Sequence, residues 1–155
     1  MSNKDYLREK RREALEKICE AWHHDLSCFI CGRTEEELAK DNKKLQIEHF
    51  GENTGKKLIQ KSEGGASNTY EVLNTPDYEI RDNFDILCDD CNAYKNGIIR
   101  ELMIYVRKLD FEGFYKRYES FLETIPEEIL YKSIILTAEK SGYKIDFNSR
   151  RIIEI

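Results

Sequence analysis

The sequence predicts an α+β fold in which helices and short strands are held together by a metal-binding cysteine cluster. Two Cys-x-x-Cys pairs, Cys28-Phe-Ile-Cys31 and Cys88-Asp-Asp-Cys91, stand far apart in the chain. Apolar residues recur at helical spacing in the N-terminal and C-terminal thirds, and the last residues alternate as in a β-hairpin. The 155 residues include only two prolines and eight glycines, a composition typical of a helix-rich globular chain.

The cysteine spacing indicates one structural zinc ion. A two-residue spacer lets both sulfurs of a pair reach the same metal, so Cys28, Cys31, Cys88 and Cys91 suit tetrahedral Zn²⁺. Thioredoxin-type redox chemistry and disulfides are the alternatives, but two such pairs in a reducing compartment favour metal. The fifth cysteine, Cys19, lies in an amphipathic segment, where we expect a small buried apolar residue.

The first half of the chain predicts short elements around the first cysteine pair. In chain order, these are a helix over residues 4–24, a strand over Ser27–Gly32, a short helix from Glu35 to about Lys40 and a strand over Leu45–Phe50. Thr34 and Glu37 match a capping box, in which the Thr34 hydroxyl accepts from the Glu37 N–H. Residues 51–67, rich in Gly, Asn, Lys and Ser, predict a loop, and residues 70–82 are ambiguous between strand and turn.

The second half predicts helices and a terminal hairpin. Residues 83–87 lead into the second cysteine pair. The expected elements are a helix from about Asp89 toward Lys108, a second helix beyond Asp110, a third opened by Pro126, and a hairpin of Tyr143–Phe147 with Arg151–Ile155. We expect an N-terminal helix (residues 1–26), a metal-stapled core (27–97) and a helical extension with the hairpin (98–155), packed as one compact unit.

Charge gives a mixed indication about nucleic acid. The net charge of −5 argues against strong phosphate binding, yet residues 1–61 carry +1 and residues 62–155 carry −6. Basic residues cluster in the less acidic part, where they are either DNA contacts or solvated faces. These residues are Arg8, Lys10, Arg11 and Arg12 in the first helix and Lys56, Lys57 and Lys61 in the loop. No apolar run approaches the roughly 20 residues of a membrane span, and the polar start is unlike a signal peptide, so we expect a cytoplasmic protein without a membrane partner.

Three motifs in order carry a family resemblance. They are Cys28-Phe-Ile-Cys31-Gly32, then Ile47-Glu48-His49, then Asn83-Phe-Asp-Ile-Leu87-Cys88-Asp-Asp-Cys91-Asn92-Ala-Tyr-Lys95. This text resembles the HNH nucleases, the zinc-containing branch of the ββα-metal (His-Me finger) superfamily, over roughly residues 27–97. The asparagine directly after the last cysteine is most similar to the phage recombination endonuclease VII group. The resemblance implies a ββα-metal core and a metal-dependent endonuclease that acts on DNA.

The resemblance also implies roles for individual residues. His49 would be the general base, and a neutral imidazole can take a proton at cytoplasmic pH. Glu48 and Asn92 would offer oxygen ligands to a catalytic Mg²⁺ or Mn²⁺, distinct from the structural zinc. Asn83 would brace the loop that orients the histidine. The family acid is usually Asp, so Glu48 is one methylene longer.

Lysines complete the expected substrate contacts. Lys95 follows Asn92 by three residues on one helical face, so it would hold a phosphate near the same metal. Lys56 and Lys57 would contact DNA from the loop. Neighbouring residues of a regular strand point to opposite faces, so Glu48 and His49 are expected to need a twisted or bulged strand end, which Gly51 would permit.

Two other functions fit the same sequence. One is a non-catalytic zinc module that binds nucleic acid or protein, with Asn92 and Asn83 as helix or turn caps. The other is an interaction protein in which residues 98–155 form a homo-oligomer or bind a partner. Aromatic residues between Phe111 and Phe121 would then form a core or a dimer face, or would stack on bases. His23 and His24 are expected in surface or packing roles.

Overall fold

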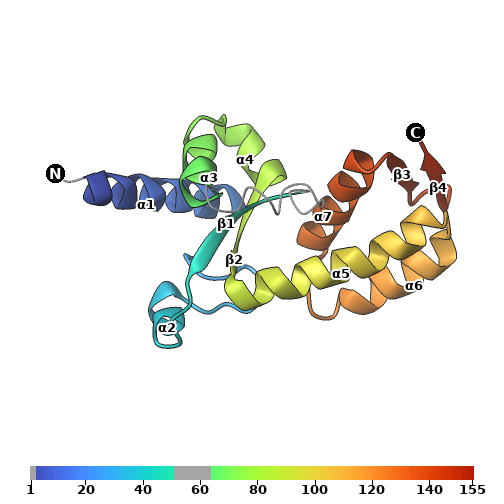
Figure 1. Ribbon diagram of the computed structural model, residues 1–155, viewed down its shortest axis with the longest axis horizontal. Coiled ribbons are helices and arrows are strands. Elements are labelled where there is room, and N and C mark those ends of the chain that lie inside the picture. Colours follow the sequence, from blue (N-terminus) through green and yellow to red (C-terminus); the bar gives the residue numbers. More distant parts are fainter. Residues whose placement is uncertain (1–2, 51–63) are drawn as a thin grey trace. The chain divides into compact units, whose positions relative to one another are not determined.

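A computed structural model of the protein describes residues 3–50 and 64–155, with the side chains of residues 64–67 excepted. The fold is α+β, as expected, with helices and small antiparallel strand pairs (Figure 1). The described residues divide into two compact units. The first contains residues 3–49 and 64–91, and the second contains Phe50 and residues 92–155, so the division falls inside one helix just after Cys91.

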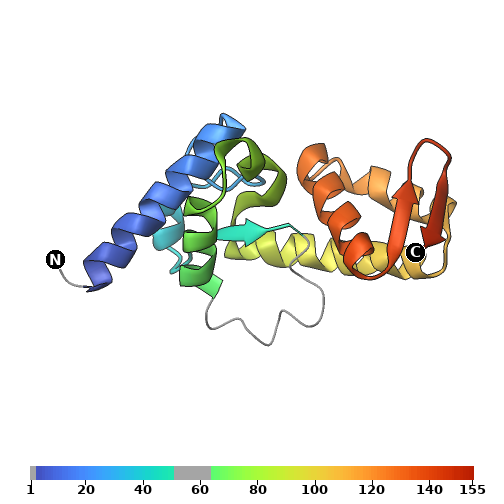
Figure 2. The same ribbon diagram turned by 90° about the horizontal axis from the view of Figure 1, so that it is seen from above.

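The first unit holds both cysteine pairs. Its elements are α1 (Asn3–Trp22), α2 (Glu35–Ala39), β1 (Leu45–His49), α3 (Gly64–Leu73), α4 (Asp77–Asn83), β2 (Phe84–Cys88) and the start of α5 (Asp89–Arg107). The long helix α1 lies alongside α3 and α4 (Figure 2). Apolar side chains from these elements are buried together: Leu15 and Ile18 of α1, Val72 of α3, and Ile80 of α4. This packing positions the strand pair.

Strands β1 and β2 pair in a regular antiparallel register. The pairing runs from Leu45 opposite Cys88 to His49 opposite Phe84, with Glu48 opposite Asp85. Directly opposite residues share a face of the sheet, and successive residues alternate. Glu48 and Asp85 therefore share one face, and His49 and Phe84 share the other. No bulge interrupts the described pairs, and Gly51 lies outside the described residues.

Side chains of α1 fix the ends of the strands. Arg11 donates from Nη2 to the Leu45 carbonyl oxygen at 2.6 Å and from Nη1 to Glu35 at 3.3 Å. Trp22 donates from Nε1 to the Phe84 carbonyl oxygen at 2.8 Å. Arg11 therefore stabilises the fold by joining α1 to β1 and α2. It belongs to the basic cluster for which DNA contact is one interpretation.

The second unit is built around aromatic side chains. It contains the rest of α5 with α6 (Phe111–Phe121), α7 (Glu127–Lys140), β3 (Tyr143–Asp146) and β4 (Arg151–Glu154), the last two paired as a hairpin. Phe111, Phe114 and Tyr118 of α6 are buried and contact Phe147, which follows β3. The core interpretation of this aromatic segment is confirmed for these residues.

Several predicted elements are confirmed, and two regions differ. The N-terminal helix, the capping box with both reciprocal hydrogen bonds, β1, α5, α6, α7 and the hairpin are present. The predicted strand over Ser27–Gly32 is wrong: within the described residues, this segment makes a single bridge from Ser27 to Thr34. Tight turns at the first cysteine pair leave no room for a strand.

The other difference concerns the middle of the chain. Residues 64–67, expected in a loop, belong to α3, and residues 70–82, expected as strand or turn, lie largely in α3 and α4. Residues 51–63 of the predicted loop lie outside the described residues. Gly, Ser and Asn are weak helix formers, so α3 depends on burial of Val72 in the core beside α1. None of the described helices is long and apolar enough to span a bilayer.

Candidate metal centre and carboxylate–histidine site

The four paired cysteines come together in one cluster. Their Sγ atoms all lie within 4.8 Å of one another, and Cys31 Sγ lies 3.8 Å from Cys88 Sγ. A tetrahedral zinc ion with Zn–S bonds of about 2.3 Å separates its sulfurs by roughly 3.8 Å. Both the all-sulfur donor set and this spacing fit a structural metal ion such as zinc.

A tight turn at each Cys-x-x-Cys pair brings its two sulfurs close together. In the first, Gly32 adopts a φ of +81°, a conformation that glycine allows without strain, and its N–H donates to the Cys28 carbonyl oxygen at 2.9 Å. In the second, the Cys91 N–H donates to Cys88 Sγ at 3.4 Å in the first turn of α5. The N–H of Phe29 donates to the Ile86 carbonyl oxygen at 2.9 Å, which holds the first turn against β2.

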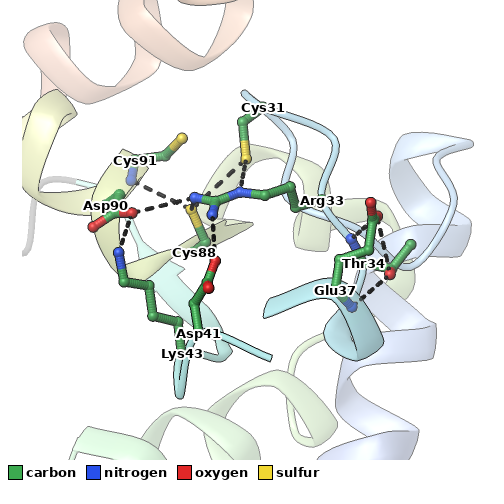
Figure 3. A network of polar contacts seen from close by, with 9 residues as sticks. All are labelled: Cys31, Arg33, Thr34, Glu37, Asp41, Lys43, Cys88, Asp90 and Cys91. Carbon is green, nitrogen blue, oxygen red and sulfur yellow. Dashed lines mark hydrogen bonds and ion pairs between the residues drawn. The ribbon is translucent and has the colours of Figure 1, made fainter. Parts of the chain in front are cut away.

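Arg33 links the two cysteine pairs (Figure 3). Its Nε donates to Cys31 Sγ at 3.4 Å, and its Nη2 donates to Cys88 Sγ at 3.5 Å and to Asp90 at 3.3 Å. Lys43 also donates to Asp90, at 2.5 Å. The guanidinium thus adds positive charge beside a centre where four thiolates would carry excess negative charge around a divalent ion.

Burial and Arg33 act in opposite directions on the thiols. Burial raises the pKa of Cys28 and of Cys91. Burial would also raise the pKa of Cys31, but hydrogen bonds from Arg33 first, and then from Cys28 and Cys91, lower it to about 6. Since the thiolate is the form that binds metal, Arg33 favours the binding form at the most exposed of the four cysteines.

Glu48 has a carboxylate partner that the sequence analysis did not identify. Asp85 lies directly opposite Glu48 in the strand pair, and the exposed fractions of the two residues are 0% for Asp85 and 8% for Glu48. Like charges directly opposite each other in a sheet are destabilising. A nearby cation or a proton on one carboxyl group offsets that repulsion. The signal in the sequence is an acid inside the otherwise apolar run of residues 84–87.

His49 contacts a second residue that the sequence analysis missed. Its Nε2 lies 3.2 Å from Oε1 of Glu71 on α3, and its ring meets the ring of Phe84 edge-on at a centroid distance of 5.1 Å. The His49 side chain is 24% exposed. No sequence motif identified Glu71 as a partner of His49, because residues 70–82 could be predicted as either strand or turn.

The remaining predicted residues are placed as follows. Asn83 ends α4 and donates from Nδ2 to the Glu79 carbonyl oxygen at 2.8 Å. Asn92 follows Cys91 directly in α5. Lys95 is buried, and its Nζ lies 5.6 Å from the centroid of the Phe50 ring. Lys56 and Lys57 lie outside the described residues.

Basic side chains of α1 and the ring of His24 make contacts within the protein. Arg12 pairs with Glu35 at 3.8 Å and Lys10 with Glu13 at 3.4 Å. The His24 ring packs on Phe29 at a centroid distance of 4.3 Å, in agreement with a packing role. Burial raises the pKa of the half-buried Cys19 thiol to about 11, so this cysteine stays protonated at neutral pH.

Comparisons of the chain with protein-family models, with curated proteins and with solved structures find no match. Membership of the HNH nucleases therefore remains a prediction from the motifs. The geometry of the cysteine cluster and of the strand end stands independently of that prediction.

Proposed function

We propose that the protein is a metal-dependent endonuclease of the HNH type that hydrolyses phosphodiester bonds in DNA. One observation supports this most: β1 and β2 pair antiparallel, β2 leads directly into α5, and the cysteine cluster lies where β2 passes into α5, although α3 and α4 separate β1 from β2 in the chain. The Glu48-His49 pair stands at the end of β1 in this arrangement. A ββα-metal core is the proposed interpretation of these elements.

His49 is the proposed general base. Its imidazole takes a proton from the water that attacks the phosphorus, a task for which proteins use histidine more often than any other side chain. Its side chain is partly exposed, at 24%, so a substrate-bound water can approach it. The Phe84 ring packs against the imidazole and limits the ring's rotation.

The opposite orientation of Glu48 and His49 suits in-line attack. In a phosphoryl transfer the attacking and leaving oxygens lie roughly in line on opposite sides of the phosphorus. His49 lies on one face of the strand end, and the carboxylates of Glu48 and Asp85 lie on the other. A phosphate that lies across the strand end would have the attacking water beside His49 and the cation on the opposite side. The regular pairing through His49 is therefore compatible with the proposed chemistry without a bulge.

Glu48 and Asp85 are the proposed carboxylate ligands of the catalytic cation. Their oxygens suit a hard Mg²⁺ or Mn²⁺, which would neutralise negative charge that develops on the phosphate during hydrolysis. Asn92 and Lys95 belong to the second unit. Their roles as a metal ligand and a phosphate contact stay predictions from the sequence motif.

Cleavage of supercoiled plasmid and branched DNA tests the proposal. We expect cutting by the zinc-loaded protein with Mg²⁺ or Mn²⁺ and none with excess chelator. His49→Ala should lower the rate by about 10²- to 10⁴-fold, the usual contribution of a general base. His23→Asn is the matched control, because His23 is an exposed histidine at a φ of 51° that asparagine tolerates.

The control variant should cut at the wild-type rate. If the folded, zinc-loaded wild type binds DNA but cuts neither substrate, and His49→Ala binds equally well, the protein is a non-catalytic zinc module instead.

A further inference from the structure

Glu71, which contacts His49, lies outside every motif that suggested a nuclease. Glu71 belongs to α3, in the stretch between His49 and Asn83 that shares no motif with the family. The contact joins residues far apart in the chain and lies within the first unit. It therefore comes from the fold of this chain.

The contact bears on the tautomer of the imidazole. His49 Nε2 and Glu71 Oε1 are 3.2 Å apart, which places the carboxylate within reach of a proton on Nε2. A neutral imidazole carries one N–H, and if that proton is on Nε2, then Nδ1 holds the lone pair that accepts a proton. A carboxylate partner also fixes the tautomer and the orientation of an imidazole ring.

Other contacts hold both partners in place. Edge-on packing of Phe84 restrains the His49 ring from within the strand pair. Glu71 lies beside Val72, which is fully buried, so the backbone of α3 is anchored in the core. Asn83, to which the family resemblance gives a bracing role, instead donates to the Glu79 carbonyl oxygen within α4.

We infer that Glu71 is a positioning residue for the proposed reaction: it holds the His49 imidazole so that Nδ1 takes the proton from the attacking water. This inference rests on the proposed nuclease function. The carboxylate accepts a hydrogen bond from Nε2–H throughout, and the proton from water moves to Nδ1 as the water oxygen bonds to phosphorus. The bond between phosphorus and the leaving oxygen breaks, and the leaving oxygen takes a proton from solvent. The resulting imidazolium is stabilised by the Glu71 charge until it passes its proton to solvent.

Substitutions at position 71 separate orientation from stability. Glu71→Ala removes both the acceptor and the charge, and Glu71→Gln keeps an acceptor of the same length without the charge. The side chain is 48% exposed, and the Thr75 hydroxyl bonds the Glu71 carbonyl oxygen, a backbone contact that both variants retain. Glu79→Gln, an exposed acid on α4, is the control.

Cleavage rate and the imidazole's NMR signature are measured on the same samples. We expect Glu71→Ala to cut about 10- to 10²-fold more slowly than wild type, less than the loss from removing the base itself. The cleavage rate of Glu71→Gln should lie between the rates of Glu71→Ala and wild type, and the rate of Glu79→Gln should match wild type.

The NMR spectra report the tautomer of His49. In ¹H–¹⁵N spectra at about pH 8.5, where imidazoles are ordinarily neutral, wild type should show a protected His49 Nε2 proton that Glu71→Ala loses.

The outcomes distinguish the inference from the proposed function. Wild-type cleavage that persists unchanged in Glu71→Ala would overturn the positioning role and leave the nuclease intact. A His49 proton found on Nδ1 in wild type would also overturn it. No cleavage by wild type would overturn the nuclease and, with it, a role for Glu71 in catalysis.

Discussion

At the scale of single residues, Arg33 is the side chain on which the metal centre most depends beyond its ligands. It reaches sulfurs of both cysteine pairs and is itself held by Asp90. Outer-shell partners of metal ligands typically contribute 10- to 100-fold to metal affinity. We therefore expect Arg33→Met to weaken zinc binding by about 10- to 100-fold, measured by competition with a chromophoric chelator.

Lys43 provides the control for Arg33. Lys43 also donates to Asp90, and no contact with a cysteine sulfur is among its described interactions. Lys43→Met should therefore bind zinc as wild type does. Equal zinc affinity in wild type and Arg33→Met would contradict the charge-compensating role of the guanidinium.

Asp85 gives a prediction about the proposed catalytic cation. Asp85→Asn should weaken Mn²⁺ binding to the zinc-loaded protein, because one carboxylate ligand is lost. Calorimetric titration with Mn²⁺ measures the effect.

An exposed acid serves for comparison with Asp85. Asp77 is 94% exposed at its side chain, so Asp77→Asn should leave Mn²⁺ binding unchanged. Unaltered Mn²⁺ binding in Asp85→Asn would remove Asp85 from the proposed ligand set.

At the scale of elements, the capping box of α2 has a stability consequence. The Thr34 hydroxyl accepts from the Glu37 N–H at 3.2 Å, and the Glu37 carboxylate accepts from the Thr34 N–H at 3.0 Å. Thr34→Ala should lower the free energy of unfolding by about 1 kcal/mol. Glu37→Gln preserves an acceptor for the Thr34 N–H, so its loss should be smaller; the reverse order in chemical denaturation would contradict the capping role.

Elements that carry their own local signal were predictable, and those that depend on packing were not. Some elements have a pattern that lies within one stretch of chain. The capping box predicts α2, the amphipathic spacing predicts α5 and α6, and the alternation of apolar residues predicts the hairpin. Helix α3 begins with glycines and is stabilised by tertiary contact with α1, which no local pattern encodes.

The residues of the candidate site were predictable to the same extent and for the same reason. Cys-x-x-Cys spacing identified the cluster, but Glu71 and Asp85 approach their partners only through the fold.

At the scale of the whole molecule, the two units should respond differently to loss of zinc. The cysteine cluster lies entirely in the first unit, whereas the second has its own aromatic core. Since binding free energy at structural zinc sites is folding free energy, a strong chelator should abolish amide protection in β1 and β2. Protection in α6 and α7 should persist, as read by hydrogen–deuterium exchange with mass spectrometry.

The double variant Cys88→Ser/Cys91→Ser should reproduce the chelator's effect without chelator. Full retention of helicity and thermal stability in this variant would contradict a structural role for the metal.

The most direct test of the central claim, that an imidazole at position 49 is the base of a metal-dependent nuclease, is chemical rescue. His49→Gly should be almost inactive on plasmid DNA with Mg²⁺ or Mn²⁺, and free imidazole should restore part of its cleavage in a saturable way. Imidazole should leave the His23→Asn control unchanged. Cleavage by His49→Gly at the wild-type rate without imidazole would contradict the account.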